Sequence, residues 1–336
     1  MRKQVTMKDI AEEMDVSIVT ISKALSGKEG VSAELRDRIN KKAQEMGYIA
    51  SKDQRKLEIR NSNVAIVVAE RFVNVNGETS FYVNVYQKLI MALTAKGFVG
   101  ILQIVTEEDE KEGVIPNVVA SGTVDQVVVV GEMRSAFLEK LSQSGVTMVF
   151  FDFENREFDV DCIVGDNVTG GYAMTRYLFK AGYKNIGFVG NYKATMSILD
   201  RLVGFKKYKL AKDLPQKDRW IITDRDLNGR NIDIKLPKDM PDAFFCNCDV
   251  TAYRMITTLE EAGYKVPEDI AIVGYDDFSP QIPEGVELTT YRVDVDEMVR
   301  QCIHIIGQRS MNPSYKRGVV LVHGSLVERK TVLPKK

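Results

Sequence analysis

The sequence predicts a small all-α head followed by a larger α/β body that holds two parallel sheets. The first 48 residues carry short helical patterns that begin at polar capping residues. From Val64 onward, short β-branched runs alternate with amphipathic helical segments, which is typical of parallel sheets covered by helices. The chain has 336 residues, more than one compact domain usually holds.

The head, residues 1–48, is predicted to form three helices. The first begins with a capping box at residues 6–9, and Ser17 and Ser32 cap the second and third. A tight turn at Asp15 separates the first two helices, so the pattern is that of a helix-turn-helix. The side chains expected to face inward are Ile10, Ala11, Met14, Ile21, Ala24, Leu25, Leu35, Ile39, Ala43 and Met46.

Nine strands are expected in the body, in two sets. The first set is Val64–Val68, Val99–Ile104, Val124–Val130 and Thr147–Phe151. The second set is Cys162–Val164, Ile186–Val189, Trp220–Thr223, Ala243–Cys246 and Ile270–Val273. Helices are expected between them at 84–95, 135–143, 168–180, 199–211 and 250–262. Nine or more strands over some 270 residues exceed one comfortable domain, and we therefore expect two doubly wound parallel-sheet subdomains. The polar stretch 49–62 is predicted to be a linker.

Composition excludes several classes of protein. Hydrophobic residues make up 44% and charged residues 28%, which is ordinary for a globular chain. The sequence has no run of 18 or more apolar residues, so we expect no transmembrane helix. The first residues are charged and lack the apolar core of a signal peptide, so we expect a cytoplasmic protein. Net charge is −1, divided into +3 for residues 1–60 and −4 for the remainder. That asymmetry is only weak support for binding nucleic acid.

The cysteines do not predict a metal site, and the sequence lacks the known catalytic motifs. Cys246 and Cys248 could suggest a metal site, but the chain has two histidines and no second close cysteine pair. We favour small residues at the end of a buried strand and expect no metal. The chain also lacks a nucleophile elbow, a phosphate-binding loop and a dinucleotide fingerprint after its first strand, so we expect neither enzyme activity nor a cofactor.

The second helix of a helix-turn-helix lies in the major groove, and its first residues reach the base edges. Lys23 could donate to guanine, while Ile18 and Val19 could pack on thymine methyl groups. Hydroxyl groups at helix N-termini suit phosphate contacts. The candidate DNA-binding residues of the head are Thr6, Met7, Ser17, Ile18, Val19, Thr20, Ser22, Lys23 and Ser32. The alternative is a small helical bundle that binds protein.

Long motifs resemble the lactose-repressor family of bacterial transcription regulators. In the head these are VTMKDIA (5–11), VSIVTISKAL (16–25), VS (31–32) and MGYI (46–49). In the body they are GYKNIGFVG (182–190), DIAIVGYDD (269–277) and LTT (288–290). The resemblance implies a DNA-binding regulator, commonly a repressor, that acts as a homodimer. It also implies a periplasmic-binding-protein-like body with a small, sugar-like effector in the cleft between its subdomains.

The resemblance also assigns the parts of the chain. Residues 63–164 and 294–322 would form the N-terminal subdomain, and 165–293 and 323–332 the C-terminal one. Residues 49–62 would form hinge helices in which Leu57 wedges into the minor groove. The hinge departs from the family pattern, because the usual alanine is Gln54 and negative charges stand at Asp53 and Glu58. In the head, Asp15 replaces the turn glycine, and aspartate tolerates left-handed backbone better than most residues.

Candidate effector-binding residues lie where ligands bind in open α/β sheets, at the carboxyl ends of strands. By family position they are Phe81, Tyr82, Asp152, Arg201, Asn247, Cys248 and Asp276. Carboxylates and an arginine beside an aromatic face suit a polyhydroxylated ligand. Taken singly, each could be a surface charge or a core aromatic. Two departures alter the pocket: Val293 replaces a glutamine, and Cys248 replaces an asparagine. An amide is then missing, or Asn247 substitutes for it.

Two other functions share this kind of body. A solute-binding transport component would need a signal peptide and would have no use for residues 1–48. A sugar-active enzyme would turn over its sugar. The sequence does not predict the effector, the operator, or whether the effector promotes or relieves DNA binding.

Overall fold

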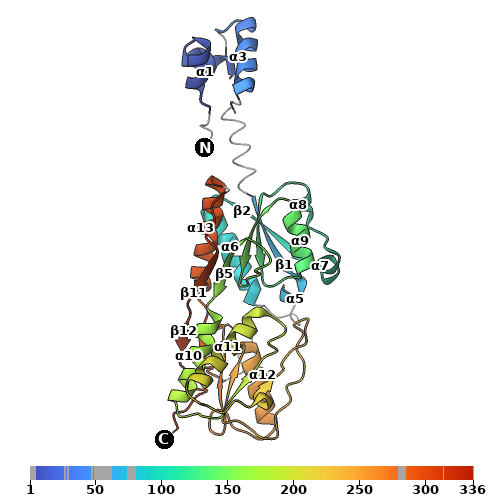
Figure 1. The fold of residues 1–336 in the computed structure, drawn as a ribbon, viewed down its shortest axis with the longest axis vertical. Coiled ribbons are helices and arrows are strands. Elements are labelled where there is room, and N and C mark those ends of the chain that lie inside the picture. The colour runs from blue at the N-terminus through green and yellow to red at the C-terminus, as the bar shows by residue number, and fades with distance from the viewer. Residues whose placement is uncertain are drawn as a thin grey trace. The chain divides into compact units, whose positions relative to one another are not determined.

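The structure is a computed structural model that describes residues 5–25, 28, 30–46, 48, 63–73, 81–278, 285–312 and 314–335. The chain forms two compact units, Met1–Asn61 and Ser62–Lys336 (Figure 1). Within the described residues, no helix is long and apolar enough to cross a membrane.

The head contains α1 (Met7–Met14), α2 (Ile18–Leu25) and α3 (Ala33–Met46). The hydroxyl of Thr6 accepts the Asp9 amide at 3.3 Å, and the Asp9 carboxylate accepts the Thr6 amide at 2.6 Å, so the predicted capping box is confirmed. Asp15 adopts the left-handed conformation, with φ of 51°. All ten side chains predicted to face inward belong to one cluster, at whose centre Ile10, Ile21 and Ile39 are fully buried.

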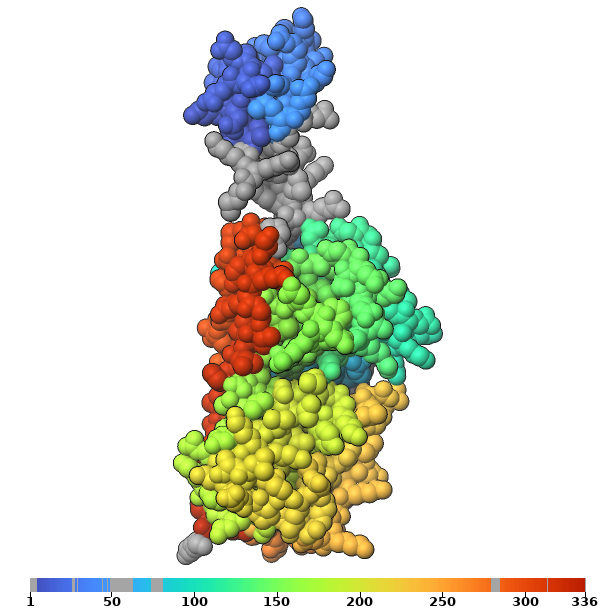
Figure 2. Space-filling view, viewed as in Figure 1, coloured from blue at the N-terminus to red at the C-terminus, as the bar shows by residue number. Residues whose placement is uncertain are grey.

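The first sheet of the body has six parallel strands in the order β11-β5-β4-β3-β1-β2. They are β1 (Asn63–Ala69), β2 (Val99–Val105), β3 (Gln126–Val130), β4 (Thr147–Phe151), β5 (Asp161–Gly165) and β11 (Val319–Val322). The accompanying helices are α5 (Glu70–Val73), α6 (Phe81–Ala95), α7 (Glu107–Glu112), α8 (Asn117–Ala120), α9 (Ser135–Gln143) and α13 (Val295–Met311). α13 runs along one flank of this sheet and appears red in Figure 2.

The second sheet has four parallel strands in the order β7-β6-β8-β9. They are β6 (Ile186–Val189), β7 (Ile221–Ile222), β8 (Ala243–Cys246) and β9 (Ala271–Val273), with helices α10 (Asn167–Lys180), α11 (Met196–Ala211) and α12 (Asp249–Glu261). A short antiparallel pair, β10 (Thr290–Arg292) and β12 (Ser325–Val327), forms a separate ladder. The subdomain boundaries given above stay a prediction, supported by this pairing of the strands.

Two details differ from the sequence-based expectation. The segment Cys162–Val164, placed in the second set, lies in β5 between β4 and β11 of the first sheet. The strand expected at Trp220–Thr223 is limited to β7, because Asp218–Trp220 forms a 3₁₀ turn. The indole of Trp220 donates to the carbonyl of Asp239 at 2.6 Å, which holds this residue in the turn ahead of the strand.

Two glycines allow α10 and α11 to cross closely. A Cβ atom at Gly171 would lie 2.2 Å from the carbonyl oxygen of Arg201, and one at Gly204 would lie 2.1 Å from that of Val168. Real Cβ atoms do not approach backbone so closely. The crossing therefore needs glycine on both helices. It also fixes the position of the Arg201 backbone, which lies against Gly171.

Candidate functional site

The start of α2 presents apolar side chains to solvent. Ile18 is 48% exposed and Val19 is 63% exposed, and Lys23 is exposed one turn after Val19 on the same helix face. Ser22 is also exposed, and Thr20 is partly buried. These side chains form a mixed apolar and basic surface that fits the edges of bases in a major groove.

Hydroxyl groups mark the helix N-termini of the head. Ser17 accepts the Thr20 amide at 3.1 Å, Ser32 accepts the Leu35 amide at 3.3 Å, and Thr6 caps α1. All three capping residues are exposed, and Met7 on α1 is partly buried. Their exposure and the positive ends of the helices suit contacts with phosphate groups. The hinge residues Leu57, Gln54, Asp53 and Glu58 lie outside the described residues, so the expectations for the hinge stay predictions.

In the body, Arg201 is the centre of a buried cluster that we define as Tyr82, Asp152, Arg201 and Asp276. Its guanidinium Nη2 lies 3.2 Å from the Asp276 carboxylate, and Nη1 donates to the carbonyl of Asn247 at 2.6 Å. Nε donates to Asn167 at 2.9 Å, and the guanidinium lies over the ring of Tyr275 at 3.9 Å. Arg201 is therefore fixed by groups of its own sheet, at the carboxyl ends of the strands.

The other half of the buried cluster comes from the first sheet. The hydroxyl of Tyr82, at the start of α6, donates to Asp152 at 2.9 Å, directly after β4. Asp152 and Asp276 both have positive φ, at 68° and 100°, a strained backbone conformation that is found most often at active sites and ligand sites. The ring of Phe81 contacts Tyr82 and, from the opposite sheet, Phe278. The fold thus brings these predicted residues together from both sheets.

Burial changes the ionisation of the two carboxylates. It raises the pKa of Asp276 from its ordinary value of 3.8 to about 6, against the opposing effect of Arg201. It also raises the pKa of Asp152, while Arg201 and the hydrogen bond from Tyr82 act in the other direction. Above about pH 6 the ionised Asp276 carboxylate only accepts hydrogen bonds, while Arg201 remains a charged donor, so the cluster offers both kinds of group to the hydroxyls of a ligand.

Asn247 and Cys248 are held by a second network. The side-chain amide of Asn247 is 1% exposed, donates to Asp224 at 2.9 Å and accepts from Arg225 at 3.2 Å. Arg225 also lies 3.3 Å from the sulfur of Cys248, which caps α12 and is partly buried. The amide of Asn247 is thus occupied within its own subdomain, which favours the reading in which a ligand-contacting amide is missing. Cys246 ends the buried strand β8.

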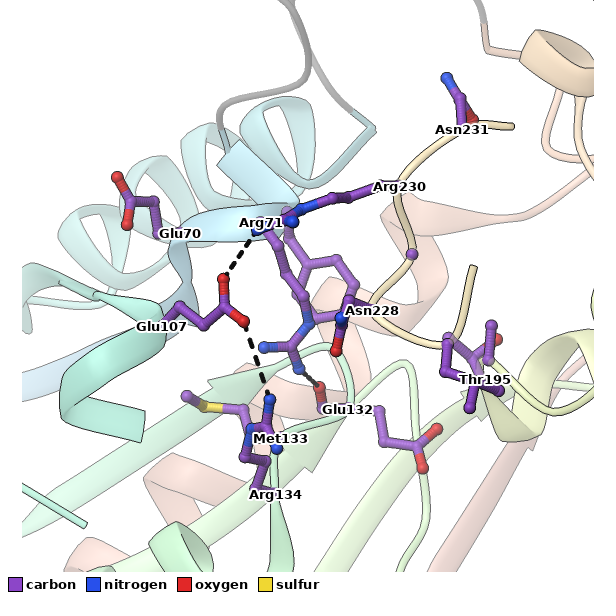
Figure 3. A pocket seen from close by; sticks show the side chains of 14 residues that line it. Glu70, Arg71, Glu107, Glu132, Met133, Arg134, Thr195, Asn228, Arg230 and Asn231 are labelled. Carbon is purple, nitrogen blue, oxygen red and sulfur yellow. Dashed lines mark hydrogen bonds and ion pairs between the residues drawn. The ribbon is translucent and has the colours of Figure 1, made fainter. Parts of the chain in front are cut away.

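A cavity of about 800 Å³ opens next to the buried cluster, between the two sheets (Figure 3). It is lined by Glu70, Arg71, Phe72, Glu107, Glu132, Met133, Arg134, Ala194, Thr195, Leu227, Asn228, Gly229, Arg230 and Asn231. Its volume suits a small ligand. None of the seven predicted residues is among these described lining residues, whereas one of them, Asp152, lines a second cavity of about 810 Å³. Phe72 connects the first cavity with the buried cluster, since its ring packs on Tyr82 with centroids 4.7 Å apart.

The lining of this cavity is strongly charged. Arg71 pairs with Glu110, which is fully buried, and donates to the carbonyl of Glu132 at 2.6 Å. Burial raises the pKa of Glu132, with the Met196 amide and Arg71 opposing it. These polar groups can orient a ligand rich in hydrogen-bonding groups.

The sequence contained a signal for these residues. Arg71 follows β1, Glu107 follows β2, and Glu132 follows β3. All stand at carboxyl ends of strands, so the rule that selected Asp152 and Asp276 also selects them. None of the motifs that resemble the family contains these positions, so the sequence-based candidates do not include them.

Comparison with families of known proteins gives two matches. Residues 6–51 match the model described as bacterial regulatory proteins, lacI family. Residues 175–332 match the model described as periplasmic binding protein-like domain.

The chain is similar to curated proteins along almost all of its length. It is 25% identical over 334 residues to the HTH-type transcriptional repressor PurR of Klebsiella pneumoniae, covering 97% of this chain and 96% of that protein. The same identity and coverage hold for PurR of Salmonella paratyphi B.

Solved structures share the fold. The transcriptional regulator CelR–cellobiose complex has a TM-score of 0.68 at 23% identity, covering 98% of this chain and all of that one. The lac repressor dimer bound to operator and the anti-inducer ONPF has a TM-score of 0.67 at 19% identity, with the same coverage. A LacI family regulator from Enterococcus faecium with bound ribose has a TM-score of 0.64 at 21% identity and covers 81% of this chain and all of that one.

Proposed function

Because this chain belongs to the lacI family of bacterial regulatory proteins, we propose that it is a sequence-specific transcription repressor controlled by a small, sugar-like effector. The observation that carries the proposal is the exposed surface of α2, where Ile18, Val19 and Lys23 stand on a helix-turn-helix head. Operator DNA is its macromolecular partner, and the proposal places the protein in the cytoplasm, where that DNA is.

The proposed effector site is the cleft between the two sheets of the body. Similar regulators hold cellobiose and ribose, which supports a carbohydrate here. The buried cluster and the charged cavity beside it supply carboxylates, arginines and an aromatic face within one region. Only a ligand that binds the open and closed arrangements with different affinity can change DNA binding, and we therefore place the effector where residues of both sheets lie close together.

A homodimer is part of the proposal. The similar lac repressor binds its operator as a dimer. Support in this chain comes from the edge strand β2 and the neighbouring helix α6, where Met91, Val99 and Ile104 are exposed apolar side chains. Sedimentation equilibrium on the full chain tests this part, and a monomer at micromolar concentration would contradict it.

The deciding experiment is footprinting on DNA upstream of neighbouring genes. We expect a protected palindrome, because a symmetric dimer reads two half-sites. Ile18→Ala combined with Val19→Ala should remove the protection, whereas Lys8→Ala on α1 serves as an exposed control outside the reading surface. Absence of any protected palindrome at low salt, with and without sugars, would refute the proposal.

The rival function is a sugar-active enzyme with the same body. Family relatives are transcription regulators, and we propose that this chain has no enzymatic activity. Incubation of the pure protein with cellobiose or ribose, followed by chromatography of the sugars, tests this. Turnover that persists through purification would favour the enzyme.

A further inference from the structure

We propose that the ion pair of Glu107 with Arg230 and the hydrogen bond of Glu132 with Met196 form a clasp that holds the two subdomains closed over the cavity. We call these four residues the clasp. Glu107 and Glu132 follow strands of the six-stranded sheet, whereas Met196 and Arg230 belong to the four-stranded sheet and its loops. The regulatory meaning of the clasp rests on the proposed function, but its contacts and its test require neither DNA nor effector.

The first contact crosses the mouth of the cavity. Arg230 extends over the cavity toward α7, where its Nη2 donates to the Glu107 carboxylate at 3.0 Å (Figure 3). The other oxygen of Glu107 faces Arg134 of its own subdomain at 4.0 Å. Glu107 thus lies between one cation of its own sheet and one of the opposite sheet, which orients it toward the cleft.

The loop that carries Arg230 is ordered by its own hydrogen bonds. The Asp226 carboxylate accepts the amides of Asn228 and Arg230, each at 2.9 Å. The Asp226 amide donates to the carbonyl of Arg230 at 2.8 Å, and a β-bridge joins Arg225 to Asn231. The backbone that carries Arg230 is therefore ordered beside the tip of a hairpin, which fixes the point from which its side chain extends across the cavity.

The second contact uses the N-terminus of α11. The Met196 amide donates to the Glu132 carboxylate at 2.8 Å. First-turn amides of a helix have no acceptor within the helix. Thr195 caps the Ile198 amide at 3.3 Å, and Glu132 of the opposite subdomain accepts the Met196 amide. A carboxylate at this position is also favoured by the positive end of the helix.

The ion pair of the clasp contributes only a small free energy to closure. Glu107 is 54% exposed and Arg230 is 69% exposed, and an ion pair in solvent contributes little because water screens it. Its loss should shift the closing equilibrium by roughly two- to fivefold. An interaction this weak favours the closed arrangement only slightly. An effector with a modest preference for either arrangement can therefore outweigh it and control the equilibrium.

Amide hydrogen exchange of Met196, measured by NMR on the full chain without DNA or sugar, tests the clasp. If both contacts report one closing equilibrium, Arg230→Gln and Glu107→Gln should each make the Met196 amide exchange roughly two- to fivefold faster, although neither residue touches Met196. Glu132→Ala should raise exchange further, because it removes the acceptor itself.

Arg219→Gln is the matched control. Arg219 is also an exposed arginine paired with a carboxylate, Asp239, but both lie in the C-terminal subdomain, so Met196 exchange should not change. Unchanged exchange of Met196 in Arg230→Gln and Glu107→Gln, or in Glu132→Ala, would overturn the clasp. The footprinting result is independent: a clasp without an operator footprint would leave the clasp standing and refute the repressor.

Discussion

At the scale of single residues, the side chains of α2 that hold the head together are buried, and those proposed to contact bases are exposed. Ile21 and Ala24 face the core of the head, whereas Ile18, Val19 and Lys23 of the same eight-residue helix face solvent. Apolar groups with no core to join are kept exposed where a partner will cover them. In a helix-turn-helix that partner is the floor of the major groove.

The first prediction concerns Lys23. Replacing it with Ala should relax base preference at one position of each half-site and weaken specific binding by about 1–3 kcal/mol. Selection of bound sequences from a randomised operator library measures the preference. Lys41→Ala on α3, also exposed, is the control. An unchanged preference at every position would remove Lys23 from the reading surface.

The second prediction concerns Asp276, whose pKa is raised to about 6 in the folded chain. A raised carboxyl pKa means that the folded state binds this proton more tightly than the unfolded state does. Its contribution to stability is therefore present below pH 3.8 and is lost as pH rises through about 6. The free energy of unfolding of the native chain, minus that of Asp276→Asn, should fall by about 2 kcal/mol between pH 4 and 7.

Urea unfolding followed by the fluorescence of Trp220, the single tryptophan, measures this difference. Asp233→Asn, the same change of side chain at an exposed position, is the control. A difference between native chain and Asp276→Asn that stays flat over this pH range would contradict the assigned shift.

At the scale of elements, the close crossing of α10 and α11 decides where Arg201 points. Gly204→Ala should destabilise the body by about 2–4 kcal/mol, because its Cβ would collide with the backbone of Val168 and Tyr172. Gly307→Ala in α13 is the matched control: its Cβ meets open space among the described residues, so it should stabilise by about 0.5–1 kcal/mol. Equal stabilities of the two variants, by the same urea assay, would contradict the crossing.

At the scale of the whole molecule, the proposed repressor needs communication between the cleft and the head. Arg201 pairs with Asp276 within its own sheet, and its charge also acts on Asp152 across the cleft. Arg201→Ala should therefore abolish the effect of an effector on operator binding while operator binding itself remains. Gel-shift titration with a sugar that shifts the native chain measures both quantities. A retained response would remove Arg201 from the effector site.

Much of this protein follows from local pattern in its sequence. The capping box at Thr6, the turn at Asp15 and the inward face of each head helix are short-range features, and the structure has them as expected. The alternation of strands and helices in the body is equally local. The exact ends of the strands could not be predicted from local pattern. Trp220, for example, lies in a 3₁₀ turn ahead of β7, and its indole is hydrogen-bonded to Asp239, a residue distant in sequence.

For the candidate site too, some features were predicted from the sequence and others came only from the tertiary structure. Family motifs in the sequence selected Asp152, Arg201 and Asp276, of which the two aspartates follow strands and Arg201 lies within α11. The sequence alone determined that an α/β body with parallel sheets follows a DNA-binding helix-turn-helix head. Only the tertiary structure decided that the side chain of Asn247 is occupied by Asp224 and Arg225, and that helices and loops from both sheets line a charged cavity. The physical reason is that burial and pairing depend on groups far apart along the chain, whereas capping and periodicity depend on neighbours.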